Sequence, residues 1–138
     1  MSHKNVDTLT EFFDRVVTGE MASALELIHP ECVLDEAAGL PYGGDYIGPD
    51  GFLRLWTVIA EDFDLTVISS QVHDAGDVVV AEMQASLRSK ATGHTLDTSI
   101  VELYRFADGQ ISGIDVYYKD TLAVAQLAAA TAAQGYGA

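Results

Sequence analysis

The sequence has little positive charge and only one cysteine. Its 138 residues include 7 Lys and Arg against 21 Asp and Glu, a formal net charge of −14. A surface of that sign repels nucleic-acid phosphates and anionic membranes, so we expect neither as a partner. Cys32 alone cannot form an internal disulfide, and a zinc site would need more thiols. These shortages predict a soluble protein of a reducing compartment, with the cytoplasm as the expected location.

Long apolar runs and ligand-binding motifs are also missing. Residues 1–7 contain no apolar core of signal-peptide length. No stretch reaches the ~18 apolar residues of a membrane-spanning helix. The four histidines form no HxH or HxxxH pair, so we expect no metal site. No glycine-rich phosphate-binding motif of the GxGxxG kind is present either.

What is present fits one compact domain of mixed structure. The length lies within the roughly 100–200 residues of a typical domain, and 49% of the residues are hydrophobic. We expect one domain over residues 1–138, with flexible ends at 1–5 and 134–138.

The periodicity of apolar residues predicts helices first and strands later. The first part of the chain is expected to contain a helix over 9–17 begun by a Thr8-x-x-Glu11 capping box, a helix over 21–28 closed by Pro30, a strand over 32–36, a glycine-rich loop over 37–48 and a helix from Pro49. The second part is expected to contain strands over 65–72, 78–88, 95–106 and 111–118, and a helix from Thr121. This order predicts an α+β fold, in which a cone-shaped curved antiparallel sheet wraps around three N-terminal helices and a C-terminal helix follows.

The chain resembles the nuclear transport factor 2-like superfamily, which includes ketosteroid isomerases and SnoaL-like polyketide cyclases. Three segments carry the resemblance, namely residues 12–20, residues 40–48, and residues 104–111 together with 115–118. The resemblance implies a cone with an apolar pocket open at one end, a small apolar or aromatic ligand, and a homodimer.

Two glutamates match chemically important positions of that family. By resemblance, Glu36 corresponds to the catalytic base of ketosteroid isomerases, and Glu102 to the acid that donates a hydrogen bond to the enolate. Moving a proton beside a carbonyl needs a base near the carbon and a donor near the oxygen. Apolar surroundings can keep such an acid neutral. The implied chemistry requires no cofactor.

Strand alternation leaves alternatives open for both glutamates. A period of two puts Glu102 on one face with large apolar residues, which favours the pocket. In the alternative, Val101 and Leu103 face the core and Glu102 is solvated. Glu36 competes with Asp35, because a slip of one residue exchanges their faces, and both could also be solvated at a loop entry.

Two departures from the family pattern limit the chemistry. Phe12 stands where the isomerases carry a tyrosine hydroxyl that holds the oxyanion, which disfavours steroid isomerisation. Val116 stands where related epoxide hydrolases carry a carboxylate, which disfavours epoxide opening. Asp115 is a weaker acidic candidate, since it lies on the opposite strand face.

Aromatic side chains complete the expected site. Trp56 matches a pocket-lining position of the family, with ordinary core packing as the alternative, and Tyr46 is expected near the pocket mouth. The expected ligand-binding residues are Phe12, Tyr46, Trp56, Tyr104, Val116 and Tyr118.

Two functions remain open at this point. The first is a cofactor-independent isomerase or cyclase that acts on an apolar ketone or polyketide-like substrate, with Glu36 as general base and Glu102 as acid. The second is a non-catalytic ligand-binding or dimerisation module of the same fold.

Overall fold

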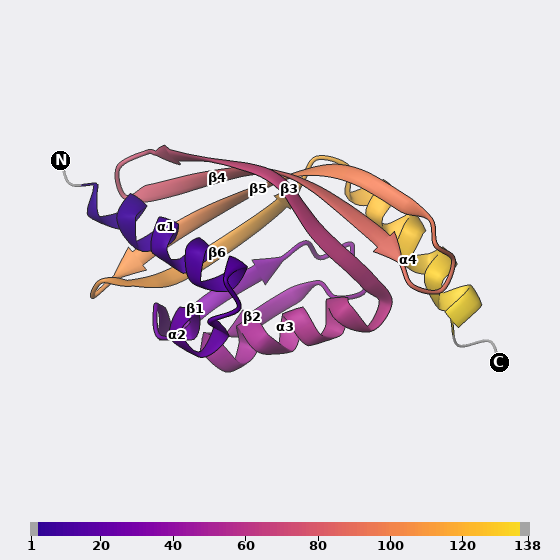
Figure 1. Cartoon of the computed structure of the whole chain (residues 1–138), viewed down its shortest axis with the longest axis horizontal. Coiled ribbons are helices and arrows are strands. Elements are labelled where there is room, and N and C mark those ends of the chain that lie inside the picture. The colour runs from indigo at the N-terminus through magenta and orange to yellow at the C-terminus, as the bar shows by residue number, and fades with distance from the viewer. Residues whose placement is uncertain (1–2, 136–138) are drawn as a thin grey trace.

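A curved six-stranded sheet bends over the first three helices (Figure 1). The computed structural model describes residues 3–135. Its helices are α1 (Lys4–Val17), α2 (Met21–Leu25), α3 (Gly48–Asp62) and α4 (Thr121–Gly135). Its strands are β1 (Ile28–Glu36), β2 (Gly44–Ile47), β3 (Phe63–Asp74), β4 (Val78–Ser89), β5 (Thr95–Ala107) and β6 (Gln110–Tyr118). The α+β class and the C-terminal helix expected from the sequence are thereby confirmed.

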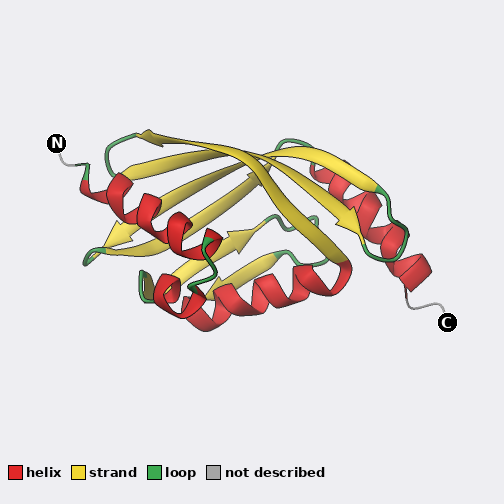
Figure 2. Cartoon of the chain, viewed as in Figure 1, coloured by secondary structure: helices red, strands yellow, loops and turns green. Residues whose placement is uncertain are grey.

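The strands lie in the order β2-β1-β6-β5-β4-β3 (Figure 2). Neighbouring strands run antiparallel except β1 and β6, which are parallel. Strands β3 to β6 follow one another as long hairpins, whereas β1 and β2 come from the first half of the chain. The parallel pair therefore joins the two halves of the sequence into one sheet.

The region around β1 differs from the sequence prediction. The second helix ends at Leu25, and Pro30 lies inside β1 instead of closing that helix. Its place is compatible with a strand because the pairing of β1 with β6 is irregular between Ile28 and Val33, where no regular ladder bond is lost. The predicted loop over 37–48 contains β2, which pairs with β1.

The start of α1 also differs from the prediction. The helix begins at Lys4, and the Thr8 hydroxyl donates a hydrogen bond to the Lys4 carbonyl inside the helix. Glu11 pairs with Arg15, one turn further on, so Thr8 and Glu11 do not form a capping box. Of the ends expected to be flexible, residues 1–2 and 136–138 lie outside the described residues, while Lys4 and Asn5 form the first turn of α1.

The core lies on the concave face of the sheet. Alternate side chains of β4 are buried there, and α1 and α3 pack their apolar faces against the same side. The buried residues of these three elements include Leu9, Phe12, Phe52, Leu55, Ile59, Val79, Ala81, Met83, Ala85 and Leu87. This arrangement encloses apolar space between the sheet and the two longer N-terminal helices.

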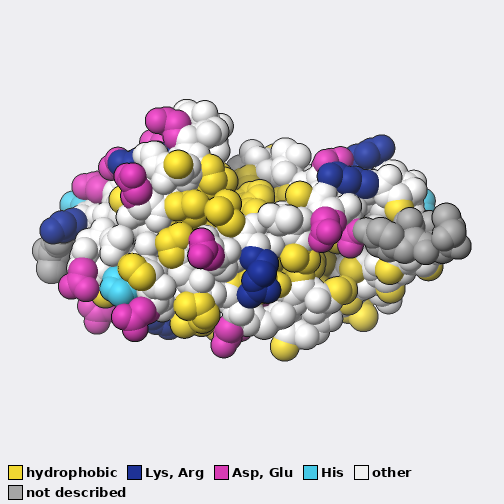
Figure 3. All heavy atoms as spheres, turned by 90° about the horizontal axis from the view of Figure 1, so that it is seen from below, with side chains coloured by type: hydrophobic (Ala, Val, Ile, Leu, Met, Phe, Trp, Pro, Cys, Tyr) yellow, Lys and Arg dark blue, Asp and Glu magenta, His cyan; other side chains and the backbone are white. Residues whose placement is uncertain are grey.

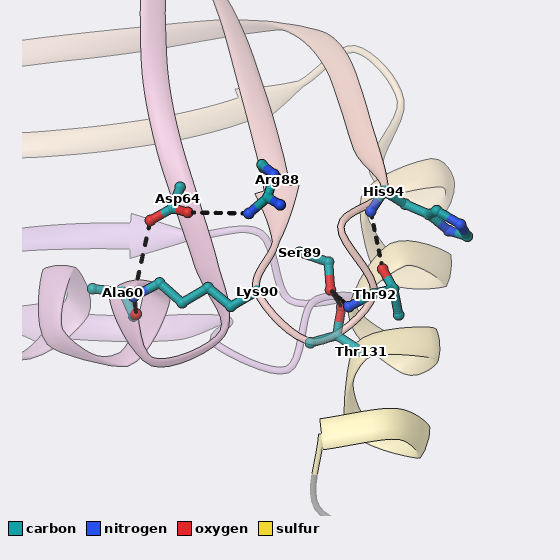
Figure 4. Close-up of polar contacts among 8 residues, drawn as sticks. All are labelled: Ala60, Asp64, Arg88, Ser89, Lys90, Thr92, His94 and Thr131. Carbon is teal, nitrogen blue, oxygen red and sulfur yellow. Dashed lines mark hydrogen bonds and ion pairs between the residues drawn. The ribbon is translucent and has the colours of Figure 1, made fainter.

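A buried hydroxyl pair fastens α4 to the far end of the sheet (Figure 4). The Thr131 hydroxyl donates to Ser89 Oγ at 2.7 Å, and Ser89 Oγ also accepts a hydrogen bond from the Thr92 N–H at 3.1 Å. Nearby, Asp64 of β3 lies 3.7 Å from Arg88 and 3.9 Å from Lys90. The β4–β5 turn is thus held both to α4 and to β3.

Acidic side chains are spread over the face in Figure 3, with only scattered basic ones, and apolar side chains gather across its middle. Within residues 3–135, no helix is both long and apolar enough to cross a membrane.

Candidate functional site

A cavity of about 190 Å³ lies between the concave face of the sheet and helices α1 and α3. Most of its walls are apolar. Besides the tyrosine hydroxyls and the Trp56 indole, its polar side chains are Glu36, Ser70 and Glu102. Val17 at the end of α1 is 84% exposed and Val67 of β3 is 50% exposed, and both border the cavity. They mark its open side.

Strand β1 turns Glu36 into this cavity and Asp35 away from it. Glu36 is only 4% exposed and borders the cavity, whereas Asp35 is exposed. On the outer face, Asp35 lies opposite Asp45 of β2 and Asp115 of β6. Of the two candidate carboxylates, Glu36 is therefore the inward one, and Asp115 shares the outer face with Asp35.

Strand β5 places Glu102 on the same cavity. Its side chain borders the cavity together with Ile100 and Tyr104, as the period of two predicts, and the Tyr104 hydroxyl donates to its Oε1 at 2.5 Å. Val101 and Leu103 alternate to the other face of the strand. Burial raises the pKa of Glu102, and the hydrogen bond from Tyr104 partly lowers it again.

The pKa of Glu36 is raised to about 7, chiefly because the carboxyl is buried. The Ala37 N–H donates to Oε1 at 3.0 Å and opposes the increase. The negative charges of Glu102 and Asp35 raise the pKa further, whereas a hydrogen bond with Tyr118 lowers it. A carboxyl that titrates near neutral pH can accept and release a proton under physiological conditions.

Val116 lies between the two glutamates on β6. It pairs directly with Glu102, and the parallel register that sets Asp35 opposite Asp115 carries Glu36 to the other side of Val116. Adjacent strands are ~4.8 Å apart, so the Cα atoms of Glu36 and Glu102 are separated by about 10 Å across β6. A ligand over Val116 can therefore reach both carboxyls.

Tyr118 connects the glutamates to the loop after β1. Its hydroxyl lies 3.1 Å from the Tyr42 hydroxyl. Burial first, and then the charges of Glu36, Tyr42 and Glu102, raise the pKa of Tyr118, so its hydroxyl keeps its proton. Burial also raises the pKa of Tyr42 to about 12. Two protonated hydroxyls therefore stand beside Glu36.

Five aromatic rings form a continuous wall of the cavity. Ring centroids lie 5.8 Å apart for Tyr104 and Phe13, 6.1 Å for Phe13 and Phe12, 5.4 Å for Phe12 and Phe52, and 6.0 Å for Phe52 and Trp56. The Tyr104–Phe13 and Phe12–Phe52 pairs meet edge to face, a favourable geometry. Such a wall suits a flat ligand.

One predicted ligand-binding residue lies elsewhere. Tyr46 does not border the cavity; its hydroxyl donates to the Tyr42 carbonyl at 2.7 Å, and the Arg54 guanidinium lies 4.3 Å from its ring centroid. The tyrosine supports the loop and α3, because β2 directs it toward the helix. The other five predicted residues, Phe12, Trp56, Tyr104, Val116 and Tyr118, all border the cavity.

Part of the cavity wall was not predicted as such. Phe13 of α1 and Phe52 and Leu55 of α3 border the cavity, and their helical spacing, which predicts the apolar faces of these helices, was the available signal. Ser70 and Met83 lie on β3 and β4 and carried no local signal that separates a cavity position from a core position.

A second cavity of about 280 Å³ meets the first at Glu36, Val116 and Tyr118. Its other lining includes Asp35, Asp115 and Thr121, so it is more polar than the first. Glu36 thus lies in the wall shared by an apolar and a polar space.

The histidines lie apart from both cavities. His73 pairs with Glu82 at 3.2 Å, and His29, which follows the helix expected over 21–28, lies in β1 with its Nε2 3.7 Å from Asp108. Among residues 3–135, no group of three or more His, Cys, Asp or Glu side chains is arranged to hold a metal ion.

Comparison with protein families finds one matching model. The model describes a SnoaL-like domain and matches residues 9–114. None of the curated protein sequences matches the chain.

Solved structures share the fold over most of the chain. An NTF2-like protein from Burkholderia thailandensis is 26% identical with a TM-score of 0.80, covering 88% of this chain and 95% of its own. TerC co-crystallised with polyporic acid is 17% identical with a TM-score of 0.78, covering 90% and 97%. A protein provisionally named a SnoaL-like polyketide cyclase, from Mesorhizobium loti, is 21% identical with a TM-score of 0.65, covering 86% and 100%.

Proposed function

The chain belongs to the SnoaL-like domain family, and we propose that it catalyses cofactor-independent proton transfer of the isomerase or cyclase type on an apolar ketone. One observation carries the proposal: two carboxyls with raised pKa values, Glu36 and Glu102, border one apolar cavity on either side of Val116. Pairs of titratable groups in different surroundings are typical of sites that need both a base and an acid.

Glu36 is the general base of this proposal. Its ionised carboxyl removes a proton from the carbon beside the substrate carbonyl; the C–H electron pair forms a C=C bond, and the π pair of the carbonyl moves to its oxygen to give an enolate. In an isomerisation, Glu36 returns the proton to another carbon of the same system. In a cyclisation, the enolate carbon bonds to a second carbonyl carbon, whose oxygen takes up the proton that Glu36 had removed, and the base is regenerated.

Glu102 is the acid. Burial favours its protonated form, and a protonated carboxyl can donate a hydrogen bond to the enolate oxygen. Tyr104 holds the other side of this carboxyl through its hydroxyl. Tyr118 and Trp56 also border the cavity, and in this proposal they position the ligand.

Phe12 and Val116 limit the range of reactions that the site can catalyse. Phe12 is buried in the cavity wall and has no hydroxyl to share the enolate charge, so Glu102 holds that charge without a tyrosine from α1. Val116 lies between the two glutamates, and its apolar side chain gives no carboxylate for epoxide opening. These substitutions favour a reaction on an already acidic C–H, such as that between two carbonyls.

The competing function is that of a ligand carrier. The continuous aromatic wall favours it, because ring stacking provides affinity without chemistry. The two functions differ in what the glutamates do. A carrier needs them only for hydrogen bonding, whereas the proposed enzyme needs Glu36 to ionise.

The test compares wild type with Glu36→Gln and Glu102→Gln on a panel of enones and polyketide-like diketones. Loss of one base or one charge-stabilising donor is expected to reduce kcat by about 10²–10³ or more. Glu31→Gln is the matched control, because Glu31 is exposed on the same strand as Glu36. In wild type, kcat/KM should rise with pH through about 7, the pKa of Glu36. Unchanged turnover in both cavity variants would refute the mechanism.

The homodimer and the cytoplasmic location expected from the sequence remain proposals. Apolar side chains on the outer face support a self-association surface, since Val33 is 39% and Tyr117 56% exposed on neighbouring strands β1 and β6. Sedimentation equilibrium of wild type and Tyr117→Lys would test it, and equal monomer masses for both would contradict it.

A further inference from the structure

The lining of the 190 Å³ cavity restricts the charge of its ligand. Among the described residues that border it, none is Lys, Arg or His, and its ionisable side chains are two glutamates and two tyrosines. A buried carboxylate or phosphate of the ligand would find no positive partner there and would lie beside Glu36 and Glu102. Burying an unpaired ion costs several kcal/mol, so an anion is excluded.

Apart from Ser70 of β3 and the Trp56 indole of α3, the polar groups of the cavity share one side. Glu36, Glu102, Tyr104 and Tyr118 come from β1, β5 and β6, which are neighbours in the sheet. The facing walls from α1 and α3 contribute the rings of Phe12, Phe13, Phe52 and Trp56 with Leu55 and Ile59. A ligand that satisfies both walls has its oxygen atoms on one edge and hydrocarbon elsewhere, because an oxygen against the helices would lose its hydrogen bonds.

The volume restricts the number of rings. A cavity of about 150 Å³ lined by Leu, Ile and Phe holds a benzene molecule with space to spare. The present cavity, at about 190 Å³, is only moderately larger. One substituted ring or two fused rings fill it, whereas a tetracyclic compound would leave much of its surface outside the mouth at Val17 and Val67.

We propose that the ligand of this cavity is a ketone of one or two rings without a negative charge, with its oxygens on one edge. The inference rests on the proposed function only in taking this cavity as the reaction site. The aromatic wall stacks on the ring, the carboxyls and hydroxyls of the sheet meet the oxygens, and the lack of positive side chains rejects acids. When a small ring ketone of this kind lies over Val116, one edge of its ring can reach both Glu36 and Glu102.

Binding tests this ligand class without requiring turnover. The probes are acetophenone with one ring, 2-acetylnaphthalene with two, and progesterone with four. An anionic analogue of the two-ring ketone, 2-naphthoate, completes the set. Titration calorimetry at pH 6, below the pKa of Glu36 of about 7, measures affinity. The fluorescence of Trp56, the single tryptophan of the chain, reports occupation of this cavity.

We expect 2-acetylnaphthalene to bind at least ten-fold more tightly than 2-naphthoate and than progesterone, and to change Trp56 fluorescence. Equal or tighter binding of the anion or of the steroid would overturn the proposal, as would failure of both small ketones to bind. Heat without a change in Trp56 fluorescence would place the ligand elsewhere and also overturn it. If the probes bind as expected but wild type turns over none of the enones and diketones of the activity panel, the proposed enzyme activity is refuted and the ligand class still stands.

A size variant and a matched control sharpen the result. Ala85 is buried on β4 and borders the cavity, so Ala85→Leu should weaken 2-acetylnaphthalene more than ten-fold and acetophenone less. If Ala85→Leu fails to fold, Ala85→Val makes the same test with one methylene less. Gln84→Leu is the control, because Gln84 is the exposed neighbour on the opposite face. Unchanged affinity in a folded Ala85 variant would contradict occupation of this cavity.

Discussion

The Tyr104 hydroxyl donates a hydrogen bond to Glu102, two residues before it on the same face of β5. Both side chains border the cavity, and the bond favours the ionised form of a carboxyl whose burial favours the neutral form. Tyr104 therefore sets how readily Glu102 gives up its proton. Residues 102 and 104 lie on the same face because side chains two positions apart in a strand point the same way.

Tyr104→Phe is expected to raise the pKa of Glu102 further and to destabilise the protein. A hydrogen bond to a charged group contributes about 1.5–3 kcal/mol and one between neutral groups about 0.5–1.5. The loss should therefore grow with increasing pH as Glu102 ionises. Urea unfolding over a pH series measures it, with the exposed Tyr117→Phe as control. A loss that becomes smaller as the pH rises would show that the hydroxyl does not stabilise the carboxylate.

Glu36 should make stability depend on pH. Its pKa is about 7 in the folded protein against an ordinary value of 4.5, so the folded state holds the proton more tightly. The stabilisation is fully present below pH 4.5 and is lost as pH rises to about 7. One pKa unit corresponds to about 1.4 kcal/mol, so the loss is roughly 3 kcal/mol.

The measurement is the free energy of unfolding of wild type minus that of Glu36→Gln, from pH 4 to pH 8. Gln cannot ionise, so this difference should fall with increasing pH. Glu31→Gln, at an exposed residue of the same strand, is the control. A flat profile for Glu36 would mean that its carboxyl titrates as if in water.

Alternation along the chain was enough to predict β3 to β6. These strands are joined by short turns, and their partners are their sequence neighbours. Strand β2 was not predicted, because its four residues begin with the second of two adjacent glycines and it becomes a strand only by pairing with β1. The local sequence contains no sign of that partner.

The candidate site was predicted in part for the same reason. The face of Glu102 follows from the apolar residues two positions away on either side. The choice between Glu36 and Asp35 depends on register, which the parallel pairing of β1 with β6 sets over a long sequence separation. Tyr46 was assigned to the mouth from its glycine-rich surroundings, but β2 and α3 turn it inward beneath the Tyr42 carbonyl.

Gly48 is expected to tolerate no side chain. It joins β2 to α3 with a φ of +66°, and a Cβ atom there would lie 2.6 Å from the Pro30 carbonyl oxygen of β1. Gly48→Ala adds the cost of a left-handed backbone, about 1 kcal/mol, to that collision, so we expect a loss of 2 kcal/mol or more, a rough sum. Thermal unfolding measures it. Gly76→Ala is the control, since Gly76 has a similar φ of +87° but open space around its Cβ position. Equal losses of stability in Gly48→Ala and Gly76→Ala would mean that the left-handed backbone alone, and not the contact with Pro30, makes a side chain costly at Gly48.

Phe12→Tyr should place a hydroxyl on the part of α1 that borders the cavity. Phe12 is 2% exposed, borders the cavity and meets Phe52 edge to face, so a hydroxyl on its ring would have few polar partners without substrate. We expect a loss of about 1–3 kcal/mol in stability of the free protein, because a buried hydroxyl without a partner is costly. In the enzyme proposed above, the same hydroxyl would meet the enolate oxygen and raise kcat by up to about 10², the usual effect of one such donor. Phe13→Tyr is the matched control on the next position of the helix. A higher kcat in Phe12→Tyr alone would place the reacting oxygen near α1, whereas equal rates in both variants would place it nearer to Glu102 and out of reach of that helix.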